Sequence, residues 1–242
     1  MVFFVYFCTR IETTTMKIAL IGYGKMGHAV EALATARGHS VVCTIDNEAE
    51  MTGREAAMRE ADVAVEFTTP ATAVANVHRC LAAKVPVVCG TTGWNADYAD
   101  VAAECRRVGG RLFTASNFSI GMNIMFALNE RLADLMAGRD GYTVSLGETH
   151  HIHKLDAPSG TALVLQEAIR RRLPQQEAPI ESIREGEVAG IHTVSYDSEA
   201  DTITITHEAH SRQGLALGAV LAAEYLEGAA PGVYTMRDML AY

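Results

Sequence analysis

The side chains best suited to proton transfer lie together in one short segment. His150, His151 and His153 fall within four positions and are followed directly by Lys154. A histidine titrates near neutral pH, so it can donate or accept a proton during a reaction. The lysine adds a positive charge suited to a carboxylate or an imine nitrogen. This combination predicts a catalytic centre that acts on a small anionic molecule.

The loop after this segment is suited to hold an anion. It contains Asp156 and Pro158 and ends at Ser159, a residue type that commonly caps the N-terminus of a helix. Gly160 and Thr161 would then present free backbone N–H groups at the helix start, where anions bind. Because the chain carries a formal net charge of −9, this local positive island suits a substrate with two carboxylates.

Two other interpretations of the histidine segment stay open. A metal site is the first, since strand spacing would place His151 and His153 on one face and His150 on the other. The segment lacks an H-E-x-x-H motif, and the nearest carboxylates are Glu148 and Asp156, so we expect no metal. In the second interpretation, the residues only cap a strand at the surface.

A glycine-rich loop near the start of the chain has the spacing of a dinucleotide-binding site. It reads Gly22-Tyr23-Gly24-Lys25-Met26-Gly27 and follows an apolar run. In this G-x-G-x-x-G pattern the first glycine permits a tight turn and the second lets the backbone approach a pyrophosphate. Asp46 ends the next apolar run, where an acid can bind the adenosine ribose and repel a 2′-phosphate. The sequence thus predicts a nicotinamide dinucleotide, with NADH favoured over NADPH, although a plain turn and a capping Asp46 are the alternatives.

Two further loops follow later apolar runs, at positions where ligands of parallel sheets bind. They are Gly90-Thr91-Thr92-Gly93 and Ser116-Asn117-Phe118-Ser119. Both offer small residues, hydroxyls and backbone N–H groups. Each alone could be an ordinary turn, but together with the glycine loop they predict the nicotinamide end of the site.

The elements that must position these residues fall into two classes. Five short runs rich in Val, Ile and Leu predict buried parallel strands at Lys17–Gly22, Ser40–Asp46, Val63–Phe67, Pro86–Cys89 and Arg111–Ala115. Helical spacing separates them, at Lys25–Arg37, Arg54–Glu60, Ala71–Ala83 and Asn95–Val108. This alternation predicts an α/β fold with a Rossmann-like, doubly wound parallel sheet.

The pattern changes after the fifth run. Helices are expected at Gly121–Met136, Thr161–Arg172 and Gly214–Leu226, and strands at Thr143–His150, Ile191–Tyr196 and Thr202–His207. The last two alternate polar with β-branched residues, which is typical of antiparallel strands. We therefore expect an inserted α+β substrate-binding and oligomerisation domain at 120–214, a dinucleotide-binding domain at 16–119 and 215–242, and an extension outside the fold at 1–15, for which a short signal sequence is the alternative.

The composition excludes several classes of partner. Apolar residues make up 49% and charged residues 20% of the 242 positions, as in ordinary globular proteins. An acidic chain whose one basic cluster is Arg170-Arg171-Arg172 is unsuited to nucleic acid or to an anionic membrane. The five scattered cysteines predict reduced thiols in a cytoplasmic protein.

The histidine segment and its loop also resemble a family signature. The run from Glu148 to Ala162, Glu-Thr-His-His-Ile-His-Lys-Leu-Asp-Ala-Pro-Ser-Gly-Thr-Ala, closely resembles that of the dihydrodipicolinate (4-hydroxy-tetrahydrodipicolinate) reductases of lysine biosynthesis. The resemblance extends from Met16 to the C-terminus. Further support comes from Gly90–Gly93, Asn117–Ser119, Arg184–Gly186, His207–Arg212 and Gly232–Leu240.

The resemblance implies an NADH- or NADPH-dependent reduction of a cyclic dicarboxylate, with loss of its 4-hydroxyl as water, by a homotetramer. His150 matches the proton donor/acceptor of the family and Lys154 its second proton-transfer residue. His151, Gly160 and Thr161 match substrate contacts. The matches to cofactor contacts are Gly22, Tyr23, Gly24, Lys25, Met26, Gly27, Asp46, Gly90, Thr91, Thr92, Ala115, Ser116, Asn117 and Phe118.

Two competing functions fit the same glycine loop. A related dehydrogenase would act on an amino or semialdehyde substrate. A dinucleotide-sensing regulatory protein would bind the cofactor without turnover, which the intact His150, Lys154 and anion loop argue against.

Overall fold

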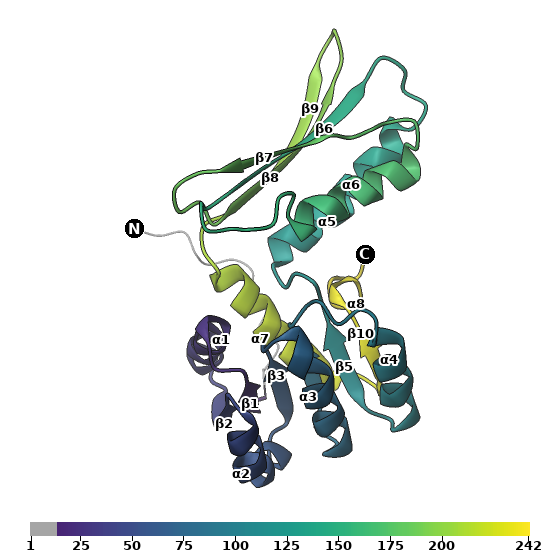
Figure 1. The fold of residues 1–242 in the computed structure, drawn as a ribbon. Helices are drawn as coiled ribbons and strands as arrows, with labels where there is room; N and C mark the ends of the chain where they lie inside the picture. Colours follow the sequence, from purple (N-terminus) through teal and green to yellow (C-terminus); the bar gives the residue numbers. More distant parts are fainter. Residues whose placement is uncertain (1–13) are drawn as a thin grey trace. The chain divides into compact units, whose positions relative to one another are not determined.

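A computed structural model describes residues 14–242 of the chain (Figure 1). The chain forms two compact units. The first extends to Ser116 and also includes Ala219–Thr235, and the second comprises Asn117–Gly218 and Met236–Tyr242. Residues 117–119, 215–218 and 236–242 thus fall in the second unit, although the sequence predicts them in the dinucleotide-binding domain. The expected extension at 1–15 lies outside the described residues except for its last two.

The first unit contains a six-stranded parallel sheet in the order β10-β5-β4-β3-β1-β2. Most of its strand residues are apolar and fully buried, because helical crossovers cover a parallel sheet on both faces. This confirms the predicted α/β, Rossmann-like fold. The strands are β1 (Lys17–Ile21), β2 (Ser40–Ile45), β3 (Val63–Glu66), β4 (Val87–Cys89), β5 (Arg111–Thr114) and β10 (Gly232–Tyr234).

Helices α1 (Lys25–Ala36), α2 (Glu48–Arg59), α3 (Pro70–Ala82), α4 (Tyr98–Arg107) and α7 (Gln213–Gly228) connect or follow these strands. Residues of α2, α3 and α4 pack on one face of the sheet in a single apolar cluster. Helix α7 lies beside α1 (Figure 1), where Glu224 accepts hydrogen bonds from Arg37. Helix α2 starts earlier than predicted because the Asn47 side chain caps it by accepting from the Glu50 N–H.

The second unit contains a four-stranded sheet in the order β7-β6-β8-β9. Strands β8 (Gly190–Asp197) and β9 (Thr202–Ala209) are antiparallel, as predicted, and β6 (Thr143–His150), predicted only as a strand, pairs antiparallel with β8. Strand β7 (Ile180–Arg184) pairs with β6 in parallel and was not predicted. Helices α5 (Ile120–Met136) and α6 (Gly160–Arg172) supply apolar residues to the cluster against this sheet, and α8 (Met236–Leu240) is a short C-terminal helix.

The helix-covered face of this sheet changes from apolar to polar along its length. Val144 and Leu146 of β6 belong to the apolar cluster, as does Val194 of β8. Because side chains alternate along a strand, the same face of β6 continues with Glu148 and His150. The fold thereby carries two titratable side chains into a buried position at the end of a core strand.

Among residues 14–242, no helix combines the length and apolar character needed to cross a membrane. Cys43, Cys80, Cys89 and Cys105 are buried free thiols. The fifth cysteine, Cys8, lies outside the described residues.

Candidate active site

The end of β6 separates the three histidines of the predicted catalytic segment. His150 is the last strand residue and is 8% exposed, while His151 is half-buried and His153 is exposed in the turn that follows. The strand spacing expected for His151 and His153 is therefore wrong, because the strand stops before them. His153 Nε2 lies 3.1 Å from an oxygen of the exposed Glu187, so its contact is with the surface of this unit.

Glu148 connects the strand to the helix that follows. Its side chain is fully buried, and both carboxylate oxygens accept the Ser159 N–H at 3.1 Å. Oε1 also lies 3.1 Å from Arg184 Nη2, on the unpredicted strand β7. Burial alone would raise the pKa of Glu148, but the bonds from Ser159 and Arg184 outweigh it and lower the pKa to about 2. Glu148 is therefore an ionised acceptor that fixes the loop before α6.

The buried carboxylate also lies beside a pair of histidines. His150 Nε2 is 3.3 Å from Nε2 of His192 on β8 and 3.5 Å from Glu148 Oε2. Burial lowers the pKa of His150, and the nearby positive charges of Lys154 and Arg184 lower it further. Burial also lowers the pKa of His192 to about 4, with a smaller contribution from the neighbouring His150. A Cβ at Gly190 would lie 3.0 Å from the His150 ring, so the backbone of β8 packs closely on it. The pair is neutral near pH 7.

The start of α6 has the geometry that the sequence predicts. Ser159 is the N-cap, and its hydroxyl accepts the Ala162 N–H at 3.2 Å. A Cβ at Gly160 would meet no atom within 4 Å, so packing does not require glycine there. The N–H groups of Gly160 and Thr161 lie in the first turn of α6, where backbone donors have no partner within the helix.

The lysine of the segment is held within the same loop. Lys154 Nζ donates to Asp156 Oδ1 at 2.6 Å, and this bond lowers the pKa of Asp156. Arg184 also donates to the Asp156 backbone carbonyl. Lys154 and Arg184 thus bind the loop that leads to α6, and each is paired with a carboxylate of this region, Asp156 and Glu148 respectively.

The Glu148 carboxylate, His150 and His192 offer ligand atoms within 4.8 Å of one another. Such a group could hold a metal ion, and the sequence did not anticipate it because His192 lies on another strand. Arg184, however, places its guanidinium on the same carboxylate at 3.1 Å. That positive charge opposes a metal cation, so the interpretation of this cluster as a proton-transfer site is preferred.

In the first unit, some glycines of the glycine loop are required by the fold and one is not. Gly22 has φ +90°, and a Cβ there would lie 1.9 Å from the Phe67 carbonyl oxygen. A Cβ at Gly27 would lie 2.4 Å from the Gly22 carbonyl oxygen. Both glycines are needed by the fold itself. Gly24 has an ordinary φ of −81° as N-cap of α1, and a Cβ there would meet nothing within 4 Å, so packing does not explain its glycine.

Asp46 already has a role in this loop, because its Oδ1 accepts the Tyr23 N–H at 2.8 Å. This bond caps no helix, because α1 has no side-chain cap and α2 is capped by Asn47. The bond holds the end of β2 against the glycine loop. The second carboxylate oxygen of Asp46, Oδ2, takes no part in that hydrogen bond.

The loops after β3 and β4 are joined to each other. Thr91 Oγ1 accepts the Thr68 N–H at 2.7 Å, and a Cβ at Gly90 would lie 2.1 Å from the Phe67 ring. The predicted residues Gly90 and Thr91 thus shape the loop. Phe67 was predicted as the last residue of its strand, but the strand ends at Glu66, so Phe67 and Thr68 belong to the loop after β3.

The residues after β5 lie at the boundary of the two units. Ala115 and Ser116 end the first unit. Asn117 Oδ1 accepts the Ser119 N–H at 2.8 Å, and Phe118 is buried at 2% exposure. Of these predicted cofactor residues, Phe118 has a side chain that is buried in the protein core.

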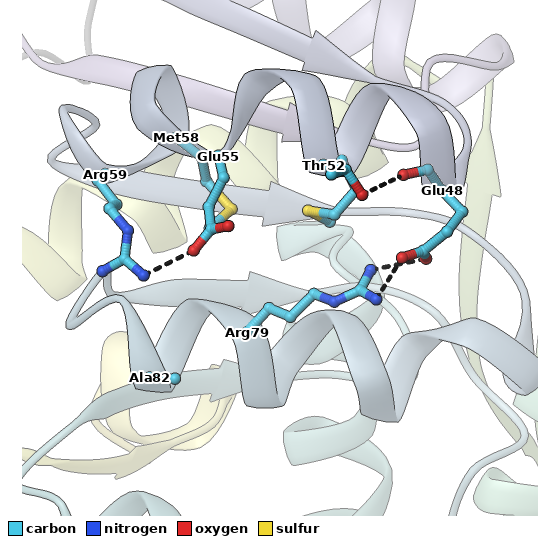
Figure 2. A pocket seen from close by; sticks show the side chains of 8 residues that line it. Glu48, Thr52, Glu55, Met58, Arg59, Arg79 and Ala82 are labelled. Atoms are coloured by element: carbon cyan, nitrogen blue, oxygen red, sulfur yellow. Dashed lines mark hydrogen bonds and ion pairs between the residues drawn. The ribbon is translucent and has the colours of Figure 1, made fainter.

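A hollow in the first unit is lined by none of the predicted site residues (Figure 2). It is situated between α2 and α3, where Arg79 is paired with Glu48 at 2.6 Å and Arg59 with Glu55 at 2.6 Å. Its charged lining is thus already paired. The lining residues are Glu48, Met51, Thr52, Glu55, Met58, Arg59, Arg79 and Ala82.

Comparisons with known proteins agree with this organisation. The family described as "Dihydrodipicolinate reductase, N-terminus" matches residues 16–118, and its C-terminal counterpart matches 121–240. A 4-hydroxy-tetrahydrodipicolinate reductase of Christiangramia forsetii is 43% identical over 93% of this chain and 98% of its own. One of Thiobacillus denitrificans is 33% identical with the same coverage of both chains, 93% and 98%.

Solved structures share the fold. A dipicolinate-bound dihydrodipicolinate reductase from Paenisporosarcina sp. TG-14 superposes with a TM-score of 0.76 at 21% identity, covering 92% of this chain and 98% of that one. GenD2 of gentamicin A biosynthesis, solved in complex with NAD, gives a TM-score of 0.60 at 13% identity, covering 94% and 90%. From its sequence match across both halves, the chain belongs to the dihydrodipicolinate reductase family.

Proposed function

We propose that the protein reduces 4-hydroxy-tetrahydrodipicolinate to tetrahydrodipicolinate in lysine (diaminopimelate) biosynthesis, with NADH or NADPH as reductant. Each turnover consumes one hydride and one proton and releases the 4-hydroxyl as water. The bound nicotinamide would supply the hydride. The observation that carries the proposal is the buried His150 joined through Glu148 to Ser159, the N-cap of α6. This arrangement connects the proposed proton-transfer residue to the N-terminus of α6, where we propose that a substrate carboxylate binds.

In this mechanism His150 is the proton donor/acceptor. Burial lowers its pKa, so His150 is mainly neutral near pH 7 and readily releases a proton once it is protonated. Lys154 is the second proton-transfer residue. Because it is bound to Asp156 at 2.6 Å, it acts from a fixed position, and substrate carboxylate would share or replace that contact.

The substrate contacts are His151, Gly160 and Thr161. His151 Nδ1 is buried and has no hydrogen-bond partner among the described residues, which suits a polar contact with a ligand. The two backbone N–H groups at the start of α6 suit a carboxylate. A dipicolinate-bound relative of the same fold makes a dicarboxylate substrate reasonable.

The first unit would bind the dinucleotide. Gly24 leaves open space at the N-terminus of α1, which suits the pyrophosphate. Asp46 Oδ2 would accept from the ribose hydroxyls, which favours NADH because a 2′-phosphate would be repelled. The remaining proposed contacts are Gly22, Tyr23, Lys25, Met26, Gly27, Gly90, Thr91, Thr92, Ala115, Ser116, Asn117 and Phe118.

The second unit would bind substrate and form the oligomer. Strand β9 is an edge strand with exposed side chains, including Ile203, and an exposed edge invites pairing with another copy. The family resemblance implies a homotetramer, and we propose that assembly with β9 at an interface between copies. The buried free thiols suit a cytoplasmic location.

A coupled assay tests this function. Dihydrodipicolinate synthase would generate the unstable substrate in place, and the loss of NADH or NADPH absorbance would report its reduction. We expect turnover with both cofactors and a higher kcat/KM for NADH. Binding of NADH without turnover would contradict the proposal and favour a sensing protein, and activity confined to an amino or semialdehyde substrate would favour a different dehydrogenase.

A further inference from the structure

His192 occupies an unusual position for a histidine. It lies on β8, opposite Glu148 in the antiparallel register, and is 5% exposed. Val194 and Tyr196 of the same strand face belong to the apolar core. An unpaired polar side chain in such a row costs free energy, so its contacts must explain its presence.

A single nitrogen of this residue meets three groups of the active site. His192 Nε2 lies 3.3 Å from His150 Nε2, 3.3 Å from Ser159 Oγ and 3.8 Å from Glu148 Oε2. The ring thus stands between the proton-transfer residue and the cap of the anion-binding helix. His192 Nδ1 is buried without a hydrogen-bond partner among the described residues, so Nε2 is the atom through which His192 acts.

We propose that His192 is a positioning residue, whose Nε2 accepts the Nε2–H of protonated His150 and fixes the orientation from which His150 transfers its proton. This inference rests on the proposed role of His150. It assigns no contact with substrate to His192. An imidazole held by a fixed partner keeps one tautomer and one ring orientation, and loss of such a partner lowers activity although the proton-transfer group remains.

The groups that face His150 come from every adjoining segment. Glu148 on β6 stabilises its protonated form, whereas Arg184 on β7 and Lys154 in the loop oppose it. His192 on β8 stays neutral because burial lowers its pKa to about 4, and the tautomer with its proton on Nδ1 leaves the Nε2 lone pair available to His150. Removing this acceptor should destabilise protonated His150 and move the alkaline limb of the kcat profile to lower pH by about one unit.

The test uses His192→Leu and His192→Gln in the full-length protein. Leucine removes the acceptor, and we expect kcat to fall about 10- to 100-fold while KM for both substrates changes by less than about threefold. Glutamine can place an amide oxygen near the Nε2 position and should restore most of kcat. Tyr196→Phe is the matched control, because it removes a buried hydroxyl without a described partner from the same strand face. It should leave kcat unchanged.

A double-mutant cycle separates this role from a general structural effect. In a His150→Gln background, His192→Leu should cost less than about a further twofold, since His192 acts through His150. A full additional loss in that background would overturn the inference, as would a rise in KM with unchanged kcat. If His192→Leu does not fold, His192→Asn, which is too short to reach the Nε2 position, repeats the cycle. Full activity of His150→Gln itself would instead reject the proposed role of His150.

Discussion

Replacing Gly24 by alanine should weaken NADH binding and leave the fold intact. Gly24 has φ −81°, and an added Cβ meets no atom within 4 Å. Alanine can therefore adopt this conformation without strain. Because alanine also restricts the unfolded chain, the free energy of unfolding should stay the same or rise by up to about 1 kcal/mol.

The cost should appear only when the cofactor binds. The added methyl group would occupy the open space through which a pyrophosphate reaches the first N–H groups of α1. Losing one backbone hydrogen bond to a charged phosphate costs about 1.5–3 kcal/mol. At about 1.4 kcal/mol per factor of ten, the Kd for NADH should rise roughly 10- to 100-fold.

Calorimetric titration with NADH and a thermal melt on the same sample measure the two effects. Gly22→Ala is the contrasting variant, because its Cβ would lie 1.9 Å from the Phe67 carbonyl oxygen at φ +90°. It should lower the Tm strongly, whereas Gly24→Ala should not. An intact Gly24→Ala protein that binds NADH as tightly as the wild type would refute the assignment of this loop to the pyrophosphate.

Two further predictions concern carboxylates. The pKa of Glu148 is about 2 in the fold against an ordinary 4.5, so its ionisation contributes about 3 kcal/mol of stability above the ordinary pKa. This contribution is lost as the pH falls from about 4.5 toward 2, so the free energies of unfolding of the wild type and Glu148→Gln, measured with urea, should become equal in that range. The control Glu187→Gln, at an exposed position, should show no such pH-dependent difference from the wild type. A difference between the wild type and Glu148→Gln that does not change with pH would refute this prediction. Asp46→Asn keeps the oxygen that accepts the Tyr23 N–H but removes the charge, so kcat/KM for NADPH relative to NADH should rise at least about tenfold. An unchanged cofactor ratio would show that Asp46 does not set the preference.

The sequence predicts well those features that are contiguous along the chain. The parallel sheet follows from its short apolar runs, and Ser159 is recognisable as a helix cap from its place before Gly160. The glycine loop shows its spacing, but only the structure separates Gly22, which the backbone requires, from Gly24, which packing does not.

The sequence did not predict contacts between residues that are distant in the chain and are brought together by strand pairing. His192 and Arg184 meet Glu148 only because β8 and β7 flank β6. The alternation around His192 does place it on the inward face with Val194, so a histidine in an apolar row was an available signal. Strand β7 was not predicted because a run of five residues that includes Glu181 and Arg184 has a weak strand pattern.

His150 is the proposed proton-transfer residue in the reduction of the dicarboxylate, and its replacement tests this role. The direct measurement compares kcat of the wild type and His150→Gln in the coupled assay, with NADH affinity measured on the same preparations. We expect a loss in kcat of about 10²- to 10⁴-fold with NADH affinity unchanged. A His150→Gln enzyme that turns over at the wild-type rate would contradict it.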